Sequence, residues 1–452
     1  MSTPAAARCP PTYRPSDRRC SGQMTAELAL RANTVGMHTD GLVPRKAEGL
    51  VTEALTDTRV VTLNGARQAG KSTLARLTAQ ARPGALVRLL DDPATLHAAR
   101  DDPAGFVDHD GLLVIDEVQL APELFRSIKV AVDTDPRPGR FLLTGSAQVL
   151  ALHQLPDALP GRMEIIELWP FSQGEIDRRP DAFIDAAFTT GPALSRTSPL
   201  RKRDYLERAV RGGYPDALSR SPRRRAAFFD SYLTNLIERD VKEVAAIERH
   251  GDLRRLLALL AGHSGSLLVP AKLAAESGIP RTTLNRYLEL LTAVFLIKQI
   301  PAWSAGQTQR AIGTPKLAFV DTGIACNLLG QDATHLGEPD GAGGPVIETF
   351  VLMELARQLT WSSERARLHH YRTRDHVEVD AVLETPDGRV VAIEVKAGAT
   401  VRSEDLTGLR HLTQRLGTRL VAGYVLYTGQ QTLSFGDRLR ALPIDALWQV
   451  GP

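Results

Sequence analysis

The chain has 452 residues, of which 24% are charged and 43% hydrophobic, and its formal net charge is +3. These proportions are typical of a soluble globular protein, and the length exceeds that of one ordinary hydrophobic core, which indicates about three domains. No apolar run is long enough to span a bilayer and the three cysteines lack the spacing of metal ligands, so we expect a cytoplasmic protein without membrane contact.

The N-terminal segment is rich in Pro, Ser, Arg and Thr and shows no hydrophobic periodicity. Such a composition buries too little apolar surface to offset the entropy of ordering the chain. Residues 1–41 are therefore predicted to form a disordered extension, and ordered structure is expected to begin near Leu42. The extension lacks the apolar core of a signal peptide, which indicates that the protein is not secreted.

A glycine-rich loop follows the first strong strand signal, a β-branched run at residues 60–63, and precedes an apolar helical pattern at residues 74–78. The loop reads G-A-R-Q-A-G-K-S-T and matches the phosphate-binding pattern G-x-x-x-x-G-K-[ST]. A loop that merely joins a strand to a helix is the alternative, which the flanking elements disfavour. The predicted nucleotide-binding residues of the loop are Gly65, Ala66, Arg67, Gln68, Ala69, Gly70, Lys71, Ser72 and Thr73.

The residue types of this loop suit a polyphosphate. Gly65 and Gly70 allow backbone conformations in which consecutive N–H groups surround an anion at a helix N-terminus. We expect Lys71 to contact the β- and γ-phosphates of ATP and to take part in catalysis, and we expect Ser72 to bind Mg²⁺.

An apolar strand predicted at residues 112–115 ends in two carboxylates, Asp116 and Glu117. In this pattern the first acid holds Mg²⁺ through water and the second polarises the attacking water. We therefore assign Asp116 to the metal and Glu117 to the catalytic base. Without the upstream loop the pair would indicate only a solvated turn, but the two motifs together predict nucleotide binding.

The rest of residues 42–170 alternates strands, at residues 85–90 and 141–143, with helical stretches. Such alternation predicts a parallel sheet with helices on both faces and a ligand at the carboxyl ends of the strands. Thr144 follows one of these strands, and in ATPases of the AAA class a polar residue at this position senses the γ-phosphate; a plain turn is the competing interpretation. Arg162 is a candidate arginine finger, with an ordinary surface arginine as the simpler interpretation.

Residues 171–250 are predicted to be helical and basic, with ten arginines or lysines between Arg196 and Arg225. Such a cluster either neutralises the phosphates of nucleic acid or forms a solvated helical face. In residues 251–310, helical patterns at 253–260, 267–279 and 282–295 predict a helix-turn-helix or winged-helix unit, although such units also serve as packing modules. The residues expected to face a DNA groove are Arg281, Thr282, Thr283, Asn285 and Arg286.

Residues 311–452 contain a predicted hairpin, with strands at 377–382 and 390–396. Side chains alternate along a strand, so Glu394 and Lys396 share one face near Asp380. These three residues are predicted to be catalytic. Asp380 and Glu394, with Glu348 from a helix predicted at residues 346–359, are predicted to bind Mg²⁺. A charged hairpin with an exposed salt bridge is the alternative.

Together these segments resemble the prokaryotic P-loop ATPases that join an AAA-type module to a C-terminal uncharacterised domain with a restriction-endonuclease-like fold. The resemblance covers nearly everything after about residue 42 and rests on GARQAGKST, LLVIDE, FLLTGS, GGYP, IERD, KLAFVDTG, EVDAVLE and AIEVKAG. It implies that Glu348, Asp380, Glu394 and Lys396 fall on the acidic and lysine positions of the PD-(D/E)XK nuclease group. Val379 stands where the name-giving motif has proline.

The sequence therefore predicts an α/β protein that binds and hydrolyses ATP with Mg²⁺ and couples this to DNA binding or to metal-dependent DNA cleavage. One alternative is an ATP-switched regulator that binds DNA or protein without cleaving it, and another is an NTPase without nucleic-acid contacts. Because AAA-type modules often act as rings, a homo-oligomer is also expected.

Overall fold

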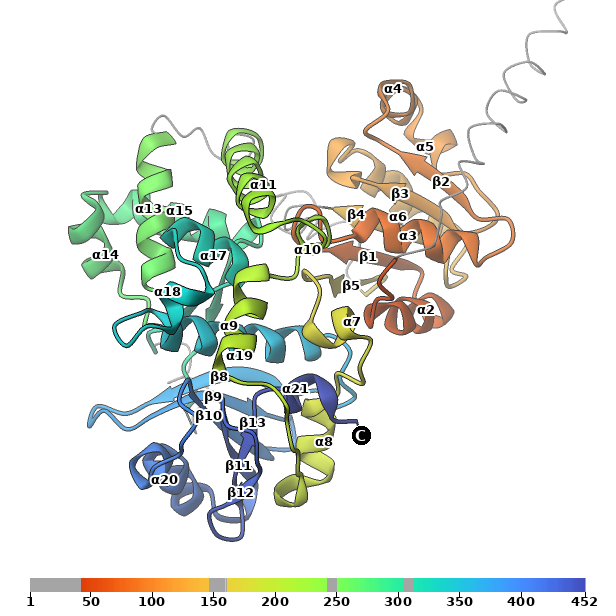
Figure 1. Ribbon diagram of the computed structural model, residues 1–452. Coiled ribbons are helices and arrows are strands. Elements are labelled where there is room, and N and C mark those ends of the chain that lie inside the picture. The colour runs from red at the N-terminus through yellow and green to blue at the C-terminus, as the bar shows by residue number, and fades with distance from the viewer. Residues whose placement is uncertain (1–41, 146–158, 160, 242–249, 305–312, 452) are drawn as a thin grey trace, which may run out of the picture. The chain divides into compact units, whose positions relative to one another are not determined.

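The computed structural model of the chain describes residues 42–145, 159, 161–241, 250–304 and 313–451 (Figure 1). The predicted extension at residues 1–41 lies outside the described residues, as does Ser146, which follows the predicted strand at 141–143. From Val43 onward the chain forms one compact unit.

The N-terminal part of this unit contains a five-stranded sheet in which every neighbouring pair of strands is parallel, as predicted. The strand order is β2-β3-β4-β1-β5. The strands are β1 Val60–Asn64, β2 Leu86–Leu89, β3 Leu113–Asp116, β4 Phe141–Gly145 and β5 Met163–Glu167. The sequence predicted the first four of these to within one or two residues but missed β5, a short run interrupted by a glutamate.

Helices cover both faces of this sheet, which confirms the predicted layers. Val61 and Leu63 of β1 point to one face and pack with α2 and α3, whereas Val60 points to the other face, where α5 and α6 pack. This alternation is the two-residue period of a strand that is buried on both sides. The helices are α2 Ala47–Asp57, α3 Lys71–Gln80, α4 Pro93–Asp101, α5 Pro103–Phe106 and α6 Leu124–Thr134, with the 3₁₀ turn η1 Val118–Leu120 after β3.

The strand order places the polar motifs next to one another. The phosphate-binding loop leaves β1, the two acids end β3, and β4 lies between these strands. In the register of the sheet Leu63 is opposite Thr144 and Ile115 is opposite Leu143. Thr144 therefore lies between the loop and the acids, at the carboxyl edge of the sheet where parallel α/β folds bind ligands.

A helical region follows the first sheet. Its elements are α7 Gln173–Asp177, α8 Phe183–Thr189, η3 Gly191–Ala193, α9 Lys202–Arg211, α10 Pro215–Leu218, α11 Pro222–Asn235, the π-helical turn η4 Leu236–Val241, α13 His250–Gly262, α14 Pro270–Ser277 and α15 Arg281–Ala293. The antiparallel pair β6 Ile297–Ile300 and β7 Lys316–Phe319 comes next, followed by α17 Thr322–Leu329 and α18 Ala333–Gly337.

The three helices predicted at residues 253–295 are present as α13, α14 and α15, with bounds that differ from the predicted ones by one to three residues. The middle helix was predicted from Leu267 and begins at Pro270, because Leu267 forms an antiparallel bridge with Lys316 and the N–H of Leu268 donates to the carbonyl of Pro315. The third helix ends before Phe295, whose φ of 58° takes the backbone out of the helix.

The C-terminal part contains a mixed six-stranded sheet in the order β12-β13-β11-β10-β9-β8. Strands β8, β9 and β10 form an antiparallel meander, and β10, β11 and β13 are parallel. The strands are β8 Arg367–Arg372, β9 Glu378–Glu384, β10 Val390–Lys396, β11 Leu420–Tyr427, β12 Leu433–Ser434 and β13 Leu439–Pro443. The accompanying helices are α19 Gly343–Gln358, η5 Ser403–Leu406, α20 Thr407–Leu416, η6 Gly417–Arg419 and α21 Ala446–Gln449.

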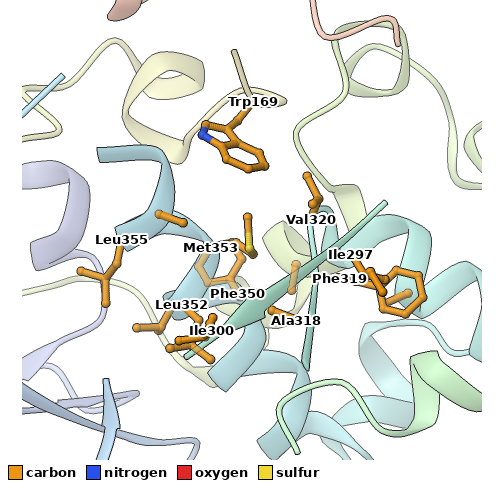
Figure 2. Close-up of a cluster of buried hydrophobic side chains, with 14 of the residues drawn as sticks. Trp169, Ile297, Ile300, Ala318, Phe319, Val320, Phe350, Leu352, Met353 and Leu355 are labelled. Atoms are coloured by element: carbon orange, nitrogen blue, oxygen red, sulfur yellow. The ribbon is translucent and has the colours of Figure 1, made fainter. Parts of the chain in front are cut away.

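The two faces of this second sheet belong to different cores. Val382 and Ala392 pack with α20, whereas Val391 and Ile393 face the large cluster that contains α19. Figure 2 shows part of that large cluster, to which Trp169, which follows β5, belongs together with side chains of β6, β7 and α19. Burying a large apolar side chain contributes about 1.5–3 kcal/mol, so this continuous core holds segments together that are far apart in the sequence.

Candidate functional site

The phosphate-binding loop has a backbone that needs its glycines. Gly70 has a φ of 97° and precedes α3, a left-handed conformation that side chains disfavour. A Cβ on Gly65 would lie only 2.1 Å from the carbonyl oxygen of Leu168. Both glycines of the motif are therefore required by the geometry of the loop.

Lys71 and Ser72 begin helix α3, and their side chains bond to different groups, the carbonyls of the loop and the carboxylate of Asp116. The Nζ atom of Lys71 donates to the carbonyl oxygens of Gly65 and Ala66, at 2.9 and 2.8 Å, so the buried amine lies within the curve of the loop. The Oγ atom of Ser72 donates to Oδ1 of Asp116 at 2.7 Å. The two predicted Mg²⁺ ligands are thus in contact, and a hydroxyl beside a carboxylate is the hard oxygen donor set that fits Mg²⁺.

Thr144 connects the two predicted acids. Its side chain is fully buried, and its Oγ1 atom donates to Oδ1 of Asp116. The Oγ1 atom of Thr144 also accepts the backbone N–H of Glu117, at 3.0 Å. Glu117 has a φ of 57°, and its carboxylate accepts a hydrogen bond from Nε2 of Gln119. Thr144 therefore fixes both acids, while γ-phosphate sensing by Thr144 stays a prediction.

Arg162 does not lie near this group. It directly precedes β5, at the amino edge of the sheet, and its Nε atom pairs with Oδ1 of Asp133 at 2.5 Å. The phosphate-binding loop is at the opposite, carboxyl edge. Within one chain, this position fits the simpler interpretation of a surface arginine.

Arg45, which the sequence did not single out, forms a hydrogen bond to the backbone of the phosphate-binding loop. Its guanidinium donates to the carbonyl oxygens of Ala69 and Trp169, at 2.5 and 2.7 Å, and pairs with Glu175 at 2.9 Å. The side chains of Arg45 and Glu175 are only 7% and 1% exposed. The contacts span 24 to 130 residues of sequence, so no local pattern indicates them.

Glu175 in turn belongs to a capping box at the start of α7. The N–H of Glu175 donates to Oγ of Ser172, and the N–H of Ser172 donates back to the Glu175 carboxylate. The same carboxylate also accepts the N–H of Lys46 at 2.8 Å. The pattern S-x-x-E is a recognised helix-start signal, so this element was readable from the sequence.

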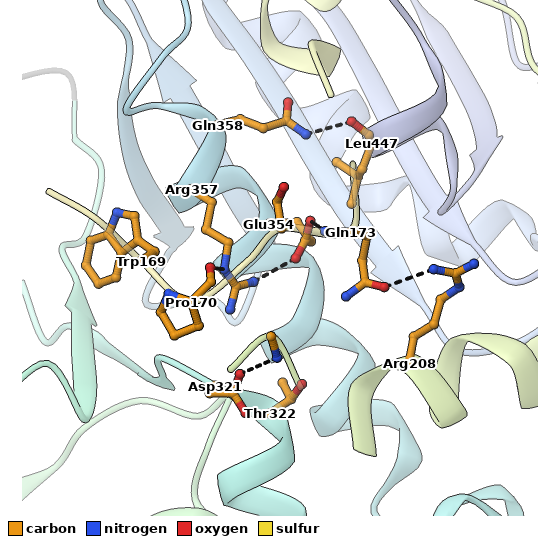
Figure 3. A network of polar contacts seen from close by, with 12 residues as sticks. Trp169, Pro170, Gln173, Arg208, Asp321, Thr322, Glu354, Arg357, Gln358 and Leu447 are labelled. Carbon is orange, nitrogen blue, oxygen red and sulfur yellow. Dashed lines mark hydrogen bonds and ion pairs between the residues drawn. The ribbon is translucent and has the colours of Figure 1, made fainter. Parts of the chain in front are cut away.

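Helix α19 forms hydrogen bonds with the residues that follow β5, at positions 170–173. The carboxylate of Glu354 accepts the N–H of Gln173 at 2.9 Å and pairs with Arg357, whose Nε atom donates to the carbonyl of Pro170 (Figure 3). Burial raises the pKa of Glu354, although Arg357 opposes this shift. The segment after β5 is therefore bonded to the phosphate-binding loop through Arg45 and to α19 through Glu354.

A cluster of carboxylates in the C-terminal part surrounds a lysine that the sequence did not assign to the site. The Nζ atom of Lys316 lies 2.6 Å from Glu348, 3.0 Å from Asp380 and 3.2 Å from Glu378. Lys316 is only 1% exposed. Burial disfavours its charged form, but the three carboxylates together outweigh burial, and the pKa of Lys316 rises.

The predicted hairpin pair lies beside this cluster. Glu394 and Lys396 share a face of β10, as alternation predicted, and their side chains pair at 2.9 Å. The N–H of Val395 donates to Oδ2 of Asp380 at 2.9 Å. Burial raises the pKa of both Glu394 and Glu348 to about 8, and the negative charge of Asp380 adds to both shifts.

The structure thus brings together the acids that the sequence predicted as metal ligands, Glu348, Asp380 and Glu394. The described residues nevertheless contain no group of three or more His, Cys, Asp or Glu side chains arranged to hold a metal ion. Lys316 gives the physical reason, because its ammonium group lies among the oxygens where a cation would bind. The residues present therefore do not fit a metal ion in this arrangement.

The predicted DNA-facing residues lie at the N-terminal end of α15. Arg281, Thr282, Asn285 and Arg286 are exposed, and Thr283 is half-buried. In the predicted basic region, by contrast, several arginines are engaged within the chain. Arg196 pairs with Asp445, Arg203 with Glu207 and Arg208 with Asp177.

Comparison with protein families gives three matches along the chain. Residues 57–177 match an AAA domain, residues 202–335 match a domain of unknown function, DUF8612, and residues 343–447 match another, DUF4143. No helix in the described segments combines the length and apolar character that a membrane span requires.

Solved structures that are similar in part include the Walker-type ATPase PABY2304 of Pyrococcus abyssi, at 17% identity and a TM-score of 0.39 over 64% of this chain and 97% of that one. The RuvB Holliday junction branch migration motor of Thermotoga maritima is 18% identical, with a TM-score of 0.28 over 57% of this chain and 90% of that one. At these scores neither likeness adds to the argument.

Two curated proteins match over most of their length. The uncharacterized proteins Rv2008c of Mycobacterium tuberculosis and Mb2031c of Mycobacterium bovis are each 30% identical over 408 residues, which is 90% of this chain and 85% of the relative. The chain therefore belongs to the same family as these mycobacterial proteins, and it carries an AAA-type P-loop ATPase domain.

Proposed function

We propose that this protein binds ATP with Mg²⁺ at the loop after β1 and hydrolyses it. The observation that carries the proposal is the hydrogen-bonded chain from Ser72 through Asp116 to Thr144 and the backbone of Glu117. Backbone N–H groups of the loop and the amine of Lys71 would bind the phosphates. Mg²⁺ supplies charge neutralisation on the phosphate oxygens, and Ser72 and Asp116 are the residues that would hold it.

Glu117 is the proposed base. Its carboxylate would accept a proton from the attacking water, and its position is fixed from two sides, by Thr144 at the backbone and by Gln119 at the side chain. Asp116 is already bonded to two hydroxyl groups, so the two adjacent acids have different surroundings and different roles.

Lys71→Ala is expected to weaken ATP binding about 10- to 100-fold, because a hydrogen bond to a charged group contributes about 1.5–3 kcal/mol. Titration with a fluorescent ATP analogue measures the affinity. Arg126→Ala removes an exposed cation of α6 and serves as the matched control. Equal affinity in the wild type and in Lys71→Ala would contradict the proposed nucleotide site.

We further propose that helix α15 contacts DNA as the recognition helix of a winged-helix unit. Support comes from the order of the elements, three helices followed by the antiparallel pair β6 and β7, and from the exposed residues Arg281 and Arg286. Neither arginine has to be released from an ion pair that the structure shows.

The double variant Arg281→Ala with Arg286→Ala is expected to weaken DNA binding and to reduce the slope of log K against log salt by about 2, since each phosphate contact contributes about 1. Fluorescence anisotropy at several salt concentrations measures this slope. Arg203→Ala is the control, because Arg203 is exposed but paired with Glu207. An unchanged slope in the double variant would mean that α15 does not contact the DNA phosphates.

Two roles were predicted for the C-terminal part, metal-dependent DNA cleavage and partner binding without cleavage. The convergence of Glu348, Asp380, Glu394 and Lys396 supports the first, and so does the order of α19, three antiparallel strands, α20 and β11, which is compatible with a nuclease-like fold. The ammonium of Lys316 among the acids supports the second. We therefore propose an ATP-switched protein that binds DNA or protein without cleaving DNA, and assembly into a homo-oligomer stays a prediction.

A further inference from the structure

Lys316 lies in a segment that the ATPase proposal does not use. It begins β7, whose four residues are all buried, and its side chain reaches two elements of the C-terminal part, α19 through Glu348 and β9 through Glu378 and Asp380. Its nitrogen is therefore surrounded by oxygens from two directions.

The contacts of this ammonium group are complete. A lysine ammonium has three N–H donors, and carboxylate oxygens of Glu348, Asp380 and Glu378 lie 2.6, 3.0 and 3.2 Å from the nitrogen. Each donor therefore has a carboxyl oxygen at hydrogen-bond or ion-pair distance. A buried charge is stable only when it is paired and hydrogen-bonded in this way.

We infer that Lys316 is the resident cation of this cluster and that its ammonium group excludes a divalent metal ion from the position between the three carboxylates. Mg²⁺ requires oxygen ligands at about 2.0–2.1 Å, so the amine and the metal cannot both occupy the space between the same oxygens. The amine also compensates the negative charge that would attract the metal. This inference is independent of ATP hydrolysis.

Glu394 and Lys396 form a second pair of a carboxyl group and an ammonium group nearby. Lys396 lies 2.9 Å from Glu394, the remaining acid of the predicted site, and 3.6 Å from Asp405, so a second ammonium group lies beside this site. Among the described residues, the acids proposed as metal ligands are thus matched by lysines of the same chain.

The test uses Mn²⁺ as the probe, with the full-length protein and without nucleotide. Electron paramagnetic resonance counts bound Mn²⁺ in the wild type, in Asp380→Asn and in Lys316→Gln. The comparison with Asp380→Asn subtracts any Mn²⁺ bound at the phosphate-binding loop. The control is Lys272→Gln, which removes an exposed lysine 62% of whose side chain is accessible.

The wild type is expected to bind no Mn²⁺ that depends on Asp380, and Lys316→Gln is expected to gain one Asp380-dependent Mn²⁺. The melting temperature of Lys316→Gln is expected to rise with Mn²⁺ by more than that of the wild type. Mn²⁺ binding by the wild type that is lost in Asp380→Asn would overturn the inference. This comparison does not depend on whether Lys316→Gln folds. A folded Lys316→Gln protein without added Mn²⁺ binding would overturn it as well.

Discussion

Glu117→Gln is expected to lower the rate of ATP hydrolysis about 10²- to 10⁴-fold, the contribution typical of a positioned general base. The amide cannot accept the proton of the attacking water. ATP affinity should change little, because the substitution keeps the size of the side chain and leaves Lys71, Ser72 and Asp116 in place. The hydrogen bond from Thr144 to Asp116 does not involve the Glu117 side chain and should persist.

A phosphate-release assay at saturating ATP measures this rate, and nucleotide titration measures the affinity. Glu123→Gln is the matched control, since Glu123 follows the same motif closely but is exposed and pairs only loosely with Arg100 at 3.6 Å. A turnover number in Glu117→Gln within a factor of three of the wild type would show that the base is another residue.

Arg45→Ala is expected to lower the free energy of unfolding by about 3–5 kcal/mol, the usual cost of removing one partner of a buried ion pair. The change leaves the nearly inaccessible Glu175 without its guanidinium and removes the donors to the carbonyls of Ala69 and Trp169. Because Ala69 belongs to the phosphate-binding loop, ATP affinity should fall as well.

Denaturant unfolding followed by fluorescence measures the stability. Arg137→Ala is the control, because Arg137 pairs with Asp135 on the surface, 58% of its side chain is exposed, and such pairs contribute about 0–1 kcal/mol. A loss below about 1 kcal/mol in Arg45→Ala would mean that the loop is held in place without this residue.

The sequence could predict a P-loop domain because its signals are local. A strand, a glycine loop and a helix follow one another within residues 60–80, and the acids directly follow the strand that orients them. Thr144 could also be placed next to the acids, since it ends a strand of the same parallel sheet. Its hydrogen bonds to both acids needed the strand order, which no short pattern contains.

The parts that the sequence missed depend on contacts between distant residues. Lys316 lies in a segment that contributes to the family resemblance, but its partners Glu348 and Asp380 follow 32 and 64 residues later. Glu378 was closer to being predictable, because it shares a strand face with Asp380 two residues away. For Arg45 no signal existed, since its partners lie in two distant segments, the phosphate-binding loop and the residues after β5.

The structure also changes the interpretation of the C-terminal motif. From the sequence, an acid, E-x-K and an upstream glutamate indicated a metal site, and these residues do converge. The same convergence brings in a lysine from β7, which a pattern within the hairpin cannot show. Residue types and spacing therefore predicted the location of the cluster but not its charge.

The central claim, that this chain hydrolyses ATP at the loop after β1, is tested most directly by steady-state ATP turnover. The purified full-length protein with Mg²⁺ is compared with Lys71→Ala and Glu117→Gln. We expect turnover in proportion to wild-type protein concentration and its loss in both variants, with ATP still bound by Glu117→Gln. Turnover that persists in both variants, or a wild type that binds ATP without hydrolysing it, would contradict the claim.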